Sequence, residues 1–353
     1  MPKIEVLDSG HIDRRDSAFP TLVRLDDGDI ICGFSVGGGP DVTGGTDWAR
    51  STDNGRTWTH EGTILAPTHD PQTSNHLRLS RTADNTILAY GLREHPNLTD
   101  DPKKHGPNEP VLCRSTDNGH TWSGSKVIPC SLGLPLEISN PIVVISDKRW
   151  LAPAATVPSF DRYGDIVVVF ESTDKGRTWP QTYTVFKDSQ QEIGYLEHKL
   201  IETTPGRILA VCWTQRFADG IDLDNHFSIS RDGGQTWGPP RSTGIHGQTM
   251  TPVWLGDGRL LVLYNRRYGS QGVQVCLVQS TDTKWTVECE EILWDASARH
   301  ERLPDADTVE ELMAFQFGFP SALRLDDENF LAVHWCKEDG VFGIRWTRLR
   351  ISL

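Results

Sequence analysis

The chain has 353 residues, with 35 Lys and Arg against 48 Asp and Glu, so its formal net charge is −13. Charged residues make up 24% and hydrophobic residues 37% of it, as in globular proteins. No cluster of basic residues occurs, and nucleic acids and anionic membranes select such clusters, so we expect neither as a partner. The start, MPKIEVLDSGH, lacks the apolar segment of a signal peptide, and no stretch reaches the roughly 18 apolar residues of a membrane span. These features predict a cytoplasmic protein.

The seven cysteines are scattered without the short spacings of a metal or disulfide framework, and several lie in apolar runs such as LAVCW. We expect them to be reduced core residues. They are Cys32, Cys113, Cys130, Cys212, Cys276, Cys289 and Cys336. Because no H-E-x-x-H, P-loop or G-x-G-x-x-G motif is present, we expect no metal and no other cofactor.

An eight-residue motif recurs along the chain. It reads STDNGRTW at 51–58, STDNGHTW at 115–122, STDKGRTW at 172–179 and SRDGGQTW at 230–237, and a fifth copy from residue 280, STDTKWT, has lost the glycine. In such a motif the aspartate accepts backbone N–H groups across a tight turn, the glycine adopts a positive φ and the tryptophan packs beneath the turn. We therefore assign the motif a structural role, as the turn between the third and fourth strands of a repeated unit.

A short apolar run that follows a turn occurs six times. The runs are DGDIICGF at 27–34, DNTILAYG at 84–91, DKRWLAPA at 147–154, PGRILAVC at 205–212, DGRLLVLY at 257–264 and DENFLAVH at 327–334. Strand-like runs lie before and after each of them, so each unit is expected to form four antiparallel strands, with very little helix anywhere. Regular spacing of this kind indicates a repeat architecture.

Six four-stranded units predict an all-β fold, a six-bladed β-propeller that takes up residues 1–353 as one domain. The N-terminal segment IEVLDSG has no blade of its own, and the last unit ends without a copy of the motif. We therefore expect residues 3–9 to complete the last blade and close the ring.

The motif copies and the six apolar runs resemble the Asp-box, or BNR, repeats of the sialidase (neuraminidase) superfamily, over essentially the whole chain. A more specific resemblance lies in the fourth unit, where EHKLIETTPGR at 197–207 is similar to the sialidase motif ENKVVELxDGR. This resemblance places Glu197 on the glutamate that polarises the catalytic tyrosine in sialidases. It places Asp41, in the long loop of the first unit, on the acid/base aspartate of that family.

Other sialidase positions differ in this chain. The first arginine of the family's carboxylate-binding cluster falls on Ala18, the second on or near Thr214 with Arg216 close by, and the third in GQTMTP at 247–252. The nucleophilic tyrosine aligns with Phe319. Since a planar carboxylate is held by such an arginine cluster, we expect a substrate other than sialic acid.

The predicted propeller brings the loops between blades, and those between second and third strands, to one face around the axis, where ligands bind. Glu137 and Glu197 open the innermost strands of adjacent blades, so both are expected to point toward the axis. Glycoside hydrolysis needs one protonated and one ionised carboxyl group. The layout is similar to that of exo-arabinanases, which use two glutamates in this fold. We expect Glu197, with Glu137 or Asp41, to be catalytic.

Other polar or aromatic residues predicted to face the same mouth are candidates for contact with a carbohydrate substrate. They are His76, Arg78, Arg93, Arg162, Tyr195, His198, Gln248, Arg266, Arg267, Gln316 and Trp335.

The favoured prediction is a glycoside hydrolase of the sialidase-like superfamily that acts in exo fashion on a small, non-sialic oligosaccharide or glycoside. Three alternatives stay open: a polysaccharide lyase or uronate-specific lyase-like enzyme, a sialidase proper, and a non-catalytic carbohydrate-binding propeller. The sequence leaves the sugar, the stereochemical outcome and the oligomeric state open.

Overall fold

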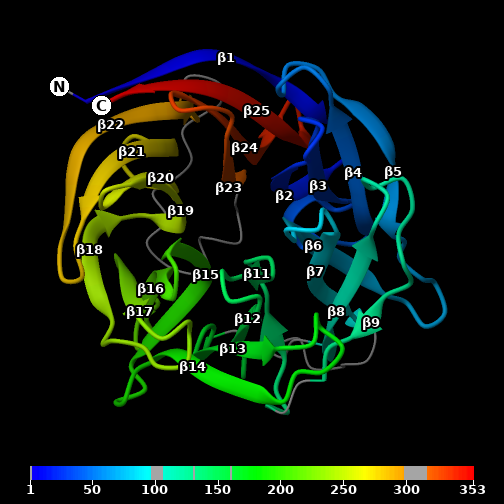
Figure 1. Ribbon diagram of the computed structural model, residues 1–353, viewed down its shortest axis with the longest axis horizontal. Coiled ribbons are helices and arrows are strands. Elements are labelled where there is room, and N and C mark those ends of the chain that lie inside the picture. Colours follow the sequence, from blue (N-terminus) through cyan, green and yellow to red (C-terminus); the bar gives the residue numbers. More distant parts are fainter. Residues whose placement is uncertain (1, 97–105, 130–131, 160, 298–315) are drawn as a thin grey trace.

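The computed structural model describes residues 2–96, 106–129, 132–159, 161–297 and 316–353. Six antiparallel sheets stand in a ring around a central axis, with the innermost strand of each sheet facing that axis (Figure 1). Helix is nearly absent from the described ranges, where a 3-10 turn, η1, comprises Gly39–Asp41. The predicted all-β, six-bladed propeller is therefore confirmed.

The first three blades each run outward from the axis in chain order. Blade one comprises β2 (Ser17–Arg24), β3 (Ile30–Val36), β4 (Gly45–Ser51) and β5 (Thr59–Leu65). Blade two comprises β6 (Ser74–Arg81), β7 (Ile87–Glu94), β8 (Asn108–Ser115) and β9 (Lys126–Val127). Blade three comprises β10 (Leu136–Glu137), β11 (Val143–Val144), β12 (Trp150–Thr156), β13 (Ile166–Ser172) and β14 (Gln181–Lys187).

The remaining blades complete the ring. Blade four comprises β15 (Ile193–Thr204), β16 (Arg207–Arg216), β17 (Asp222–Ser230) and β18 (Arg241–His246). Blade five comprises β19 (Gln248–Gly256), β20 (Arg259–Arg266), β21 (Gly272–Ser280) and β22 (Trp285–Asp295). Blade six comprises β23 (Phe317–Arg324), β24 (Asn329–Glu338), β25 (Val341–Ser352) and β1 (Lys3–Asp13).

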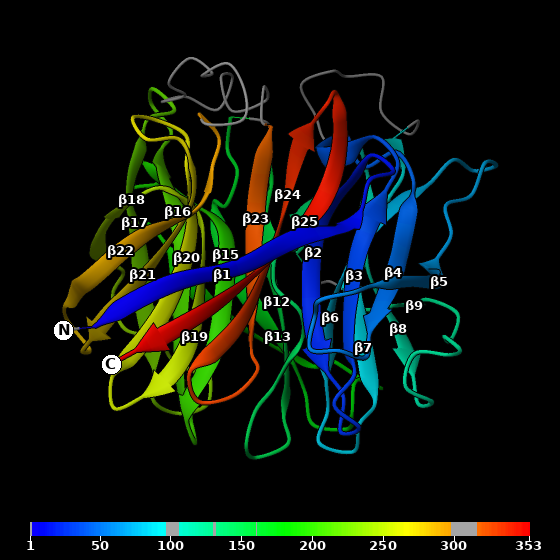
Figure 2. The same ribbon diagram turned by 90° about the horizontal axis from the view of Figure 1, so that it is seen from above.

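The ring is closed by β1, which pairs antiparallel with β25 from Lys3 opposite Ser352 to Asp13 opposite Ile344. Figure 2 shows the two strands crossing the same side of the ring, with the chain ends next to each other. The prediction that residues 3–9 complete the last blade is confirmed, and the paired segment extends to Asp13. Closure removes the exposed edge that β25 would otherwise present.

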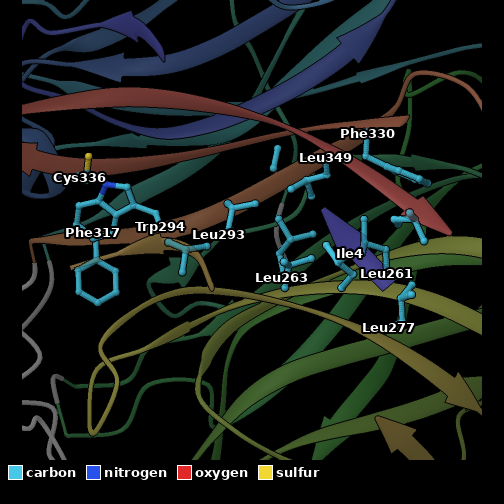
Figure 3. Close-up of a cluster of buried hydrophobic side chains, with 14 of the residues drawn as sticks. Ile4, Leu261, Leu263, Leu277, Leu293, Trp294, Phe317, Phe330, Cys336 and Leu349 are labelled. Atoms are coloured by element: carbon cyan, nitrogen blue, oxygen red, sulfur yellow. The ribbon is translucent and has the colours of Figure 1, made fainter. Parts of the chain in front are cut away.

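The hydrophobic core lies between the blades rather than at the axis. In β16, Ile208 and Ala210 pack into the cluster shared with blade three, whereas Leu209 and Val211 pack into the cluster shared with blade five. This follows from the two-residue period of a strand, since both faces of a middle strand are covered and both must be apolar. Figure 3 shows the equivalent cluster between blades five and six, which β1 joins through Ile4.

The innermost strand of blade three is interrupted. β10 and β11 both pair with β12, and Pro141 lies between them. A proline cannot donate to a strand ladder, which accounts for the break. Glu137 therefore lies at the end of a two-residue strand, immediately before an irregular segment, and not at the start of the innermost strand as predicted.

Each complete copy of the eight-residue motif joins the third and fourth strands of its blade, as predicted. In the first copy, one carboxylate oxygen of Asp53 accepts the backbone N–H groups of Arg56 and Thr57, and the other accepts the Thr57 hydroxyl. Gly55 has φ 82°, and Trp58 donates its indole N–H to the Gly55 carbonyl. Burial opposes ionisation of Asp53, but hydrogen bonds from Thr57, Ser51 and Arg56 outweigh it and lower the pKa to about 2.

Asp53→Ala is expected to lower the free energy of unfolding by about 1–2 kcal/mol, because two backbone N–H groups lose their acceptor. Asp53→Asn keeps an acceptor oxygen and should lower the free energy of unfolding by less. The lowered pKa makes the carboxylate stabilising above about pH 4, and that contribution is lost as the pH falls toward about 2. Urea unfolding at about pH 7 and about pH 3 measures this. An Asp53→Ala penalty that does not shrink at the lower pH would contradict the assignment.

Six of the seven cysteines lie in the described part of the chain, and all six are free thiols, of which Cys32, Cys113, Cys212, Cys276 and Cys336 are buried. Cys130 lies outside the described residues. No helix among the described residues is long and apolar enough to cross a membrane.

Candidate active site

Four innermost strands carry a β-bulge at which a residue other than glycine takes a positive φ. The residues are Phe19 (54°), Glu197 (45°), Thr249 (49°) and Phe319 (51°), in blades one, four, five and six. Such a conformation is strained for a bulky or β-branched side chain, and a bulge changes the direction in which side chains leave a strand. Their side chains are in contact in two pairs. The Thr249 hydroxyl donates to Glu197, and the rings of Phe19 and Phe319 lie 5.3 Å apart, edge to face.

Two carboxyl groups from adjacent blades are part of this arrangement. Glu137 accepts a hydrogen bond from the Ser139 hydroxyl, and its Oε2 lies 3.9 Å from His198 Nδ1, with 18% of its side chain exposed. Burial, assisted by the charge of Glu197, raises the pKa of Glu137 to about 7, against the opposing effects of Ser139, Lys199 and Arg78. A carboxyl group with this pKa holds its proton near neutral pH.

The second carboxyl group, Glu197, is half-buried. Burial raises its pKa as well, but the positive charges of Lys199, Arg267 and Arg78 oppose that rise. Glu197 is opposed by one more positive charge than Glu137, and the charge of Glu197 itself raises the pKa of Glu137, so Glu197 is the member of the pair that ionises first.

Three basic side chains surround the pair. Burial and the charge of Arg78 lower the pKa of Lys199 to about 7, although Glu197 and Glu137 oppose this. Burial likewise lowers the pKa of Arg78 to about 10 and that of Arg267 to about 9. We refer to these three residues with the two glutamates as the axis cluster, which comprises Arg78, Glu137, Glu197, Lys199 and Arg267.

Aromatic rings form one wall of the axis cluster. The Arg78 guanidinium lies 5.0 Å from the ring centroid of Phe19 and 4.5 Å from that of Phe319, and Lys199 Nζ lies 3.6 Å from the latter. Trp335 and His76 flank Phe19, with ring centroids 6.2 and 5.7 Å away. Cations over aromatic faces are attracted by the ring quadrupole, so this wall holds the two basic side chains in place.

Seven predicted site residues are brought together at the axis or directly beside it. They are His76, Arg78, Glu137, Glu197, His198, Arg267 and Trp335. Two of these differ from expectation in detail. His198 is fully buried, and burial with the charge of Lys199 lowers its pKa to about 3, so it is neutral. Trp335 lies within β24 and not in a loop.

Three other predicted site residues have contacts of their own. Tyr195 stacks on Phe186 at 5.1 Å within the core between blades three and four, so its predicted position facing the axis is wrong. Gln248 is buried and donates to Asp222 at 2.5 Å. The Gln316 carbonyl accepts the Lys337 N–H, and its side chain is half-buried.

Three predicted arginines are paired with acids outside the axis cluster. Arg93 binds Glu109 through Nε at 3.0 Å, and Arg266 binds Glu290 at 2.6 Å. Successive side chains of a strand leave it in opposite directions, which explains why Arg266 points outward while its neighbour Arg267 joins the cluster.

The third of these arginines, Arg162, pairs with Asp165 and lies over Phe217. It borders a cleft of about 480 Å³ between blades three and four, lined by Asp161, Arg162, Gln191, Glu192, Arg216, Phe217 and Ala218. Asp41 is exposed on η1, in the loop between β3 and β4, and its catalytic role stays a prediction.

Lys199 is the member of the axis cluster that sequence reasoning missed. It lies two residues after Glu197, and the two-residue period of a strand was the signal that could have found it. Phe319 was seen only as the substitute for the sialidase tyrosine, and Phe19 was not singled out. The bulges that turn both rings toward the axis leave no signature in the sequence.

The fold and the motif turns define a class of proteins, the sialidase-like propellers. A model of the BNR repeat-like domain family matches residues 48–331, which is most of the chain. The chain therefore belongs to the BNR repeat-like domain family. No curated protein matches it in sequence.

Three solved structures illustrate the similarity of fold. A protein of unknown function from Dyadobacter fermentans is 22% identical, with a TM-score of 0.77 and complete coverage of both chains. The NanB sialidase from Streptococcus pneumoniae is 12% identical, with a TM-score of 0.66 over 98% of this chain and 70% of that one. An α-L-arabinofuranosidase from Fusarium graminearum is 12% identical, with a TM-score of 0.67 over 98% of both chains. At these identities the likeness concerns the fold.

Proposed function

We propose that the protein is an exo-acting glycoside hydrolase in which Glu137 is the general acid and Glu197 is the ionised carboxylate. The observation that carries this proposal is the pair itself. Two glutamates from adjacent blades lie in one charged cluster, and the pKa of one of them is raised to about 7. Glycoside hydrolysis by two carboxyl groups needs one of them protonated and the other ionised.

The surroundings of each glutamate support its role. Burial and the charge of Glu197 keep the proton on Glu137, which can pass it to the glycosidic oxygen as the bond breaks. Lys199 and Arg267 favour the ionised form of Glu197, which acts on the anomeric carbon as nucleophile or on a water as base. If Glu197 is the nucleophile, Glu137 takes its proton back from the water that hydrolyses the glycosyl-enzyme in the second step. If Glu197 is the base, it takes a proton from the attacking water and releases it to solvent, from which Glu137 is protonated again.

Exo action is supported by the position of the cluster in the ring. Residues from all six blades surround the axis: the axis cluster draws on blades two to five, and Phe19 and Phe319 come from blades one and six. A site enclosed in this way suits the end of a chain or a simple glycoside better than the middle of a polymer.

Two of the alternatives are less well supported. A non-catalytic propeller would hold its axis carboxylates ionised in salt bridges, whereas the pKa of Glu137 is raised. A sialidase would need an arginine where buried Ala18 stands and a tyrosine where Phe319 stands. Phe319 lies at the axis but carries no hydroxyl group that could attack a sugar.

The proposal is tested with purified protein on a panel of 4-nitrophenyl glycosides and short oligosaccharides in both anomeric forms, including sialosides and uronides, with Glu197→Gln as the control. We expect turnover of at least one non-sialic glycoside to a saturated sugar, and its loss in the variant. An unsaturated sugar product would indicate that the enzyme is a lyase that cleaves by elimination, and it would overturn the proposal. Turnover of sialosides alone, or binding of sugars without any turnover, would also overturn the proposal.

A further inference from the structure

Arg78 is a buried cation without a counter-ion. It is 2% exposed, and its Nε and Nη1 have no hydrogen-bond partner among the described residues. Two other buried arginines have acidic partners: Arg50 Nη1 lies 2.8 Å from Asp29 Oδ2, and Arg345 Nη1 lies 3.0 Å from Glu338 Oε2. Burying a charge without a paired partner is costly, so the state in which Arg78 is satisfied requires an acceptor from outside the described chain.

A second cation converges on the same place. Lys199 Nζ and the Arg78 guanidinium both lie against the ring of Phe319, and the positive charge of Arg78 contributes to lowering the pKa of Lys199. Lys199 donates to the backbone carbonyl of Ser139, a neutral acceptor, and forms no ion pair within the described ranges. Two neighbouring cations that repel one another are stabilised when an anion lies between them.

The acidic groups nearby do not fill that place. The charges of Glu137, Glu197 and Glu94 oppose the lowering of the Arg78 pKa, yet none of the three forms an ion pair with Arg78 among the described residues. Glu94 is 35% exposed and lies 3.8 Å from His76 Nδ1. His76 is itself neutral, because burial lowers its pKa well below the ordinary value.

We propose that the substrate is an acidic sugar, a glycoside of a hexuronic acid whose carboxylate binds Arg78 and Lys199 beside the glutamate pair. This inference rests on the proposed function and names its substrate class. A planar guanidinium matches a carboxylate, and the aromatic wall of Phe19 and Phe319 fixes its orientation. Arg78 is not one of the positions on which the arginine cluster of sialidases falls, so the carboxylate would be held from a different blade.

Matched substrates test this inference. Each uronide is compared with its neutral parent, glucuronide with glucoside and galacturonide with galactoside, in both anomeric forms, and a 6-sulfated glucoside separates a carboxylate from a sulfate. We expect kcat/KM for one uronide to exceed that of its neutral parent by about 100-fold or more, since a site built to bind a polar group rejects the analogue that lacks it. Equal kcat/KM values for the pair, or a preference for the sulfated sugar, would overturn the inference.

Variants locate the carboxylate site. Arg78→Met should lower kcat/KM for the uronide at least about tenfold more than that for the neutral parent. Both substrates lose the effect of Arg78 on the glutamate pair, but only the acidic substrate also loses the guanidinium that binds its carboxylate. Arg266→Met, which removes a neighbouring arginine held by Glu290 away from the cluster, should change kcat/KM for neither substrate. An equal loss of kcat/KM on both substrates in a folded Arg78→Met variant would contradict the assignment.

Binding to a catalytically disabled protein separates this inference from the proposed function. Glu137→Gln titrated with free glucuronate and galacturonate, and with the corresponding neutral sugars, should bind one of the acids at least about tenfold more tightly. If an acid binds but no glycoside is hydrolysed by the wild type, the proposed function fails and the acid site stands. If neutral glycosides are hydrolysed and neither acid binds in preference, the proposed function stands and this inference fails.

Discussion

Glu137→Gln is expected to lower kcat/KM by about 10²–10⁴-fold on a glycoside with a weakly acidic leaving group, because the departing oxygen then receives no proton. Glutamine has the shape of glutamate and can still accept the Ser139 hydroxyl, so the fold should be unchanged. On a dinitrophenyl glycoside of the same sugar, whose leaving group departs without protonation, the loss should be less than about tenfold. Steady-state kinetics on the two substrates measure the difference.

Glu197→Gln is the matched control for this experiment. Since Glu197 acts on the anomeric carbon and not on the leaving group, its loss should be as severe on the dinitrophenyl glycoside as on the other substrate. The assignment of roles would be contradicted if Glu137→Gln were equally poor on both substrates and Glu197→Gln were rescued by the better leaving group. That pattern would make Glu197 the general acid and Glu137 the carboxylate that acts on the anomeric carbon.

Lys199→Met is expected to move the pH profile of kcat/KM to higher pH. The positive charge of Lys199 opposes the rise in the pKa of both glutamates, so its removal raises both pKa values. Glu197 then becomes ionised only at higher pH, and the acid limb of the profile moves upward. A rise of about one unit would lower kcat/KM about tenfold on that limb.

Two features distinguish this from a merely structural effect. Lys199→Arg keeps the positive charge, so its acid limb should stay close to that of the wild type, even if kcat falls through altered packing on Phe319. Neutral His198 and His76 do not supply the missing charge, because burial lowers the pKa of both. An acid limb in Lys199→Met that coincides with that of the wild type would contradict the role given to the lysine.

The ring could be predicted from the sequence because its signals are local. The turn around Asp53 depends on residues within the motif, and the closing role of β1 follows from counting strands against blades. The period of two in runs such as RILAVC reflects burial of both faces of a middle strand.

The candidate site could be predicted only in part, because it depends on the direction in which each side chain leaves its strand. Glu197 was found through a motif and Glu137 through its place in the ring, but Tyr195, on the same strand as Glu197, turned out to lie in the core. At a bulge, the side on which a residue emerges is set by the register with the neighbouring strand, and the sequence does not state that register.

The central claim is that the two glutamates at the axis share one proton near neutral pH, and a carbon-13 NMR titration of the glutamate side-chain carboxyl groups tests it without knowledge of the substrate. Comparison with spectra of Glu137→Gln and Glu197→Gln assigns the two resonances. The account predicts one carboxyl group that titrates with an apparent pKa of about 7 and is missing from the spectrum of Glu137→Gln. Titration of both groups at the ordinary glutamate value, about 4.3, would contradict it.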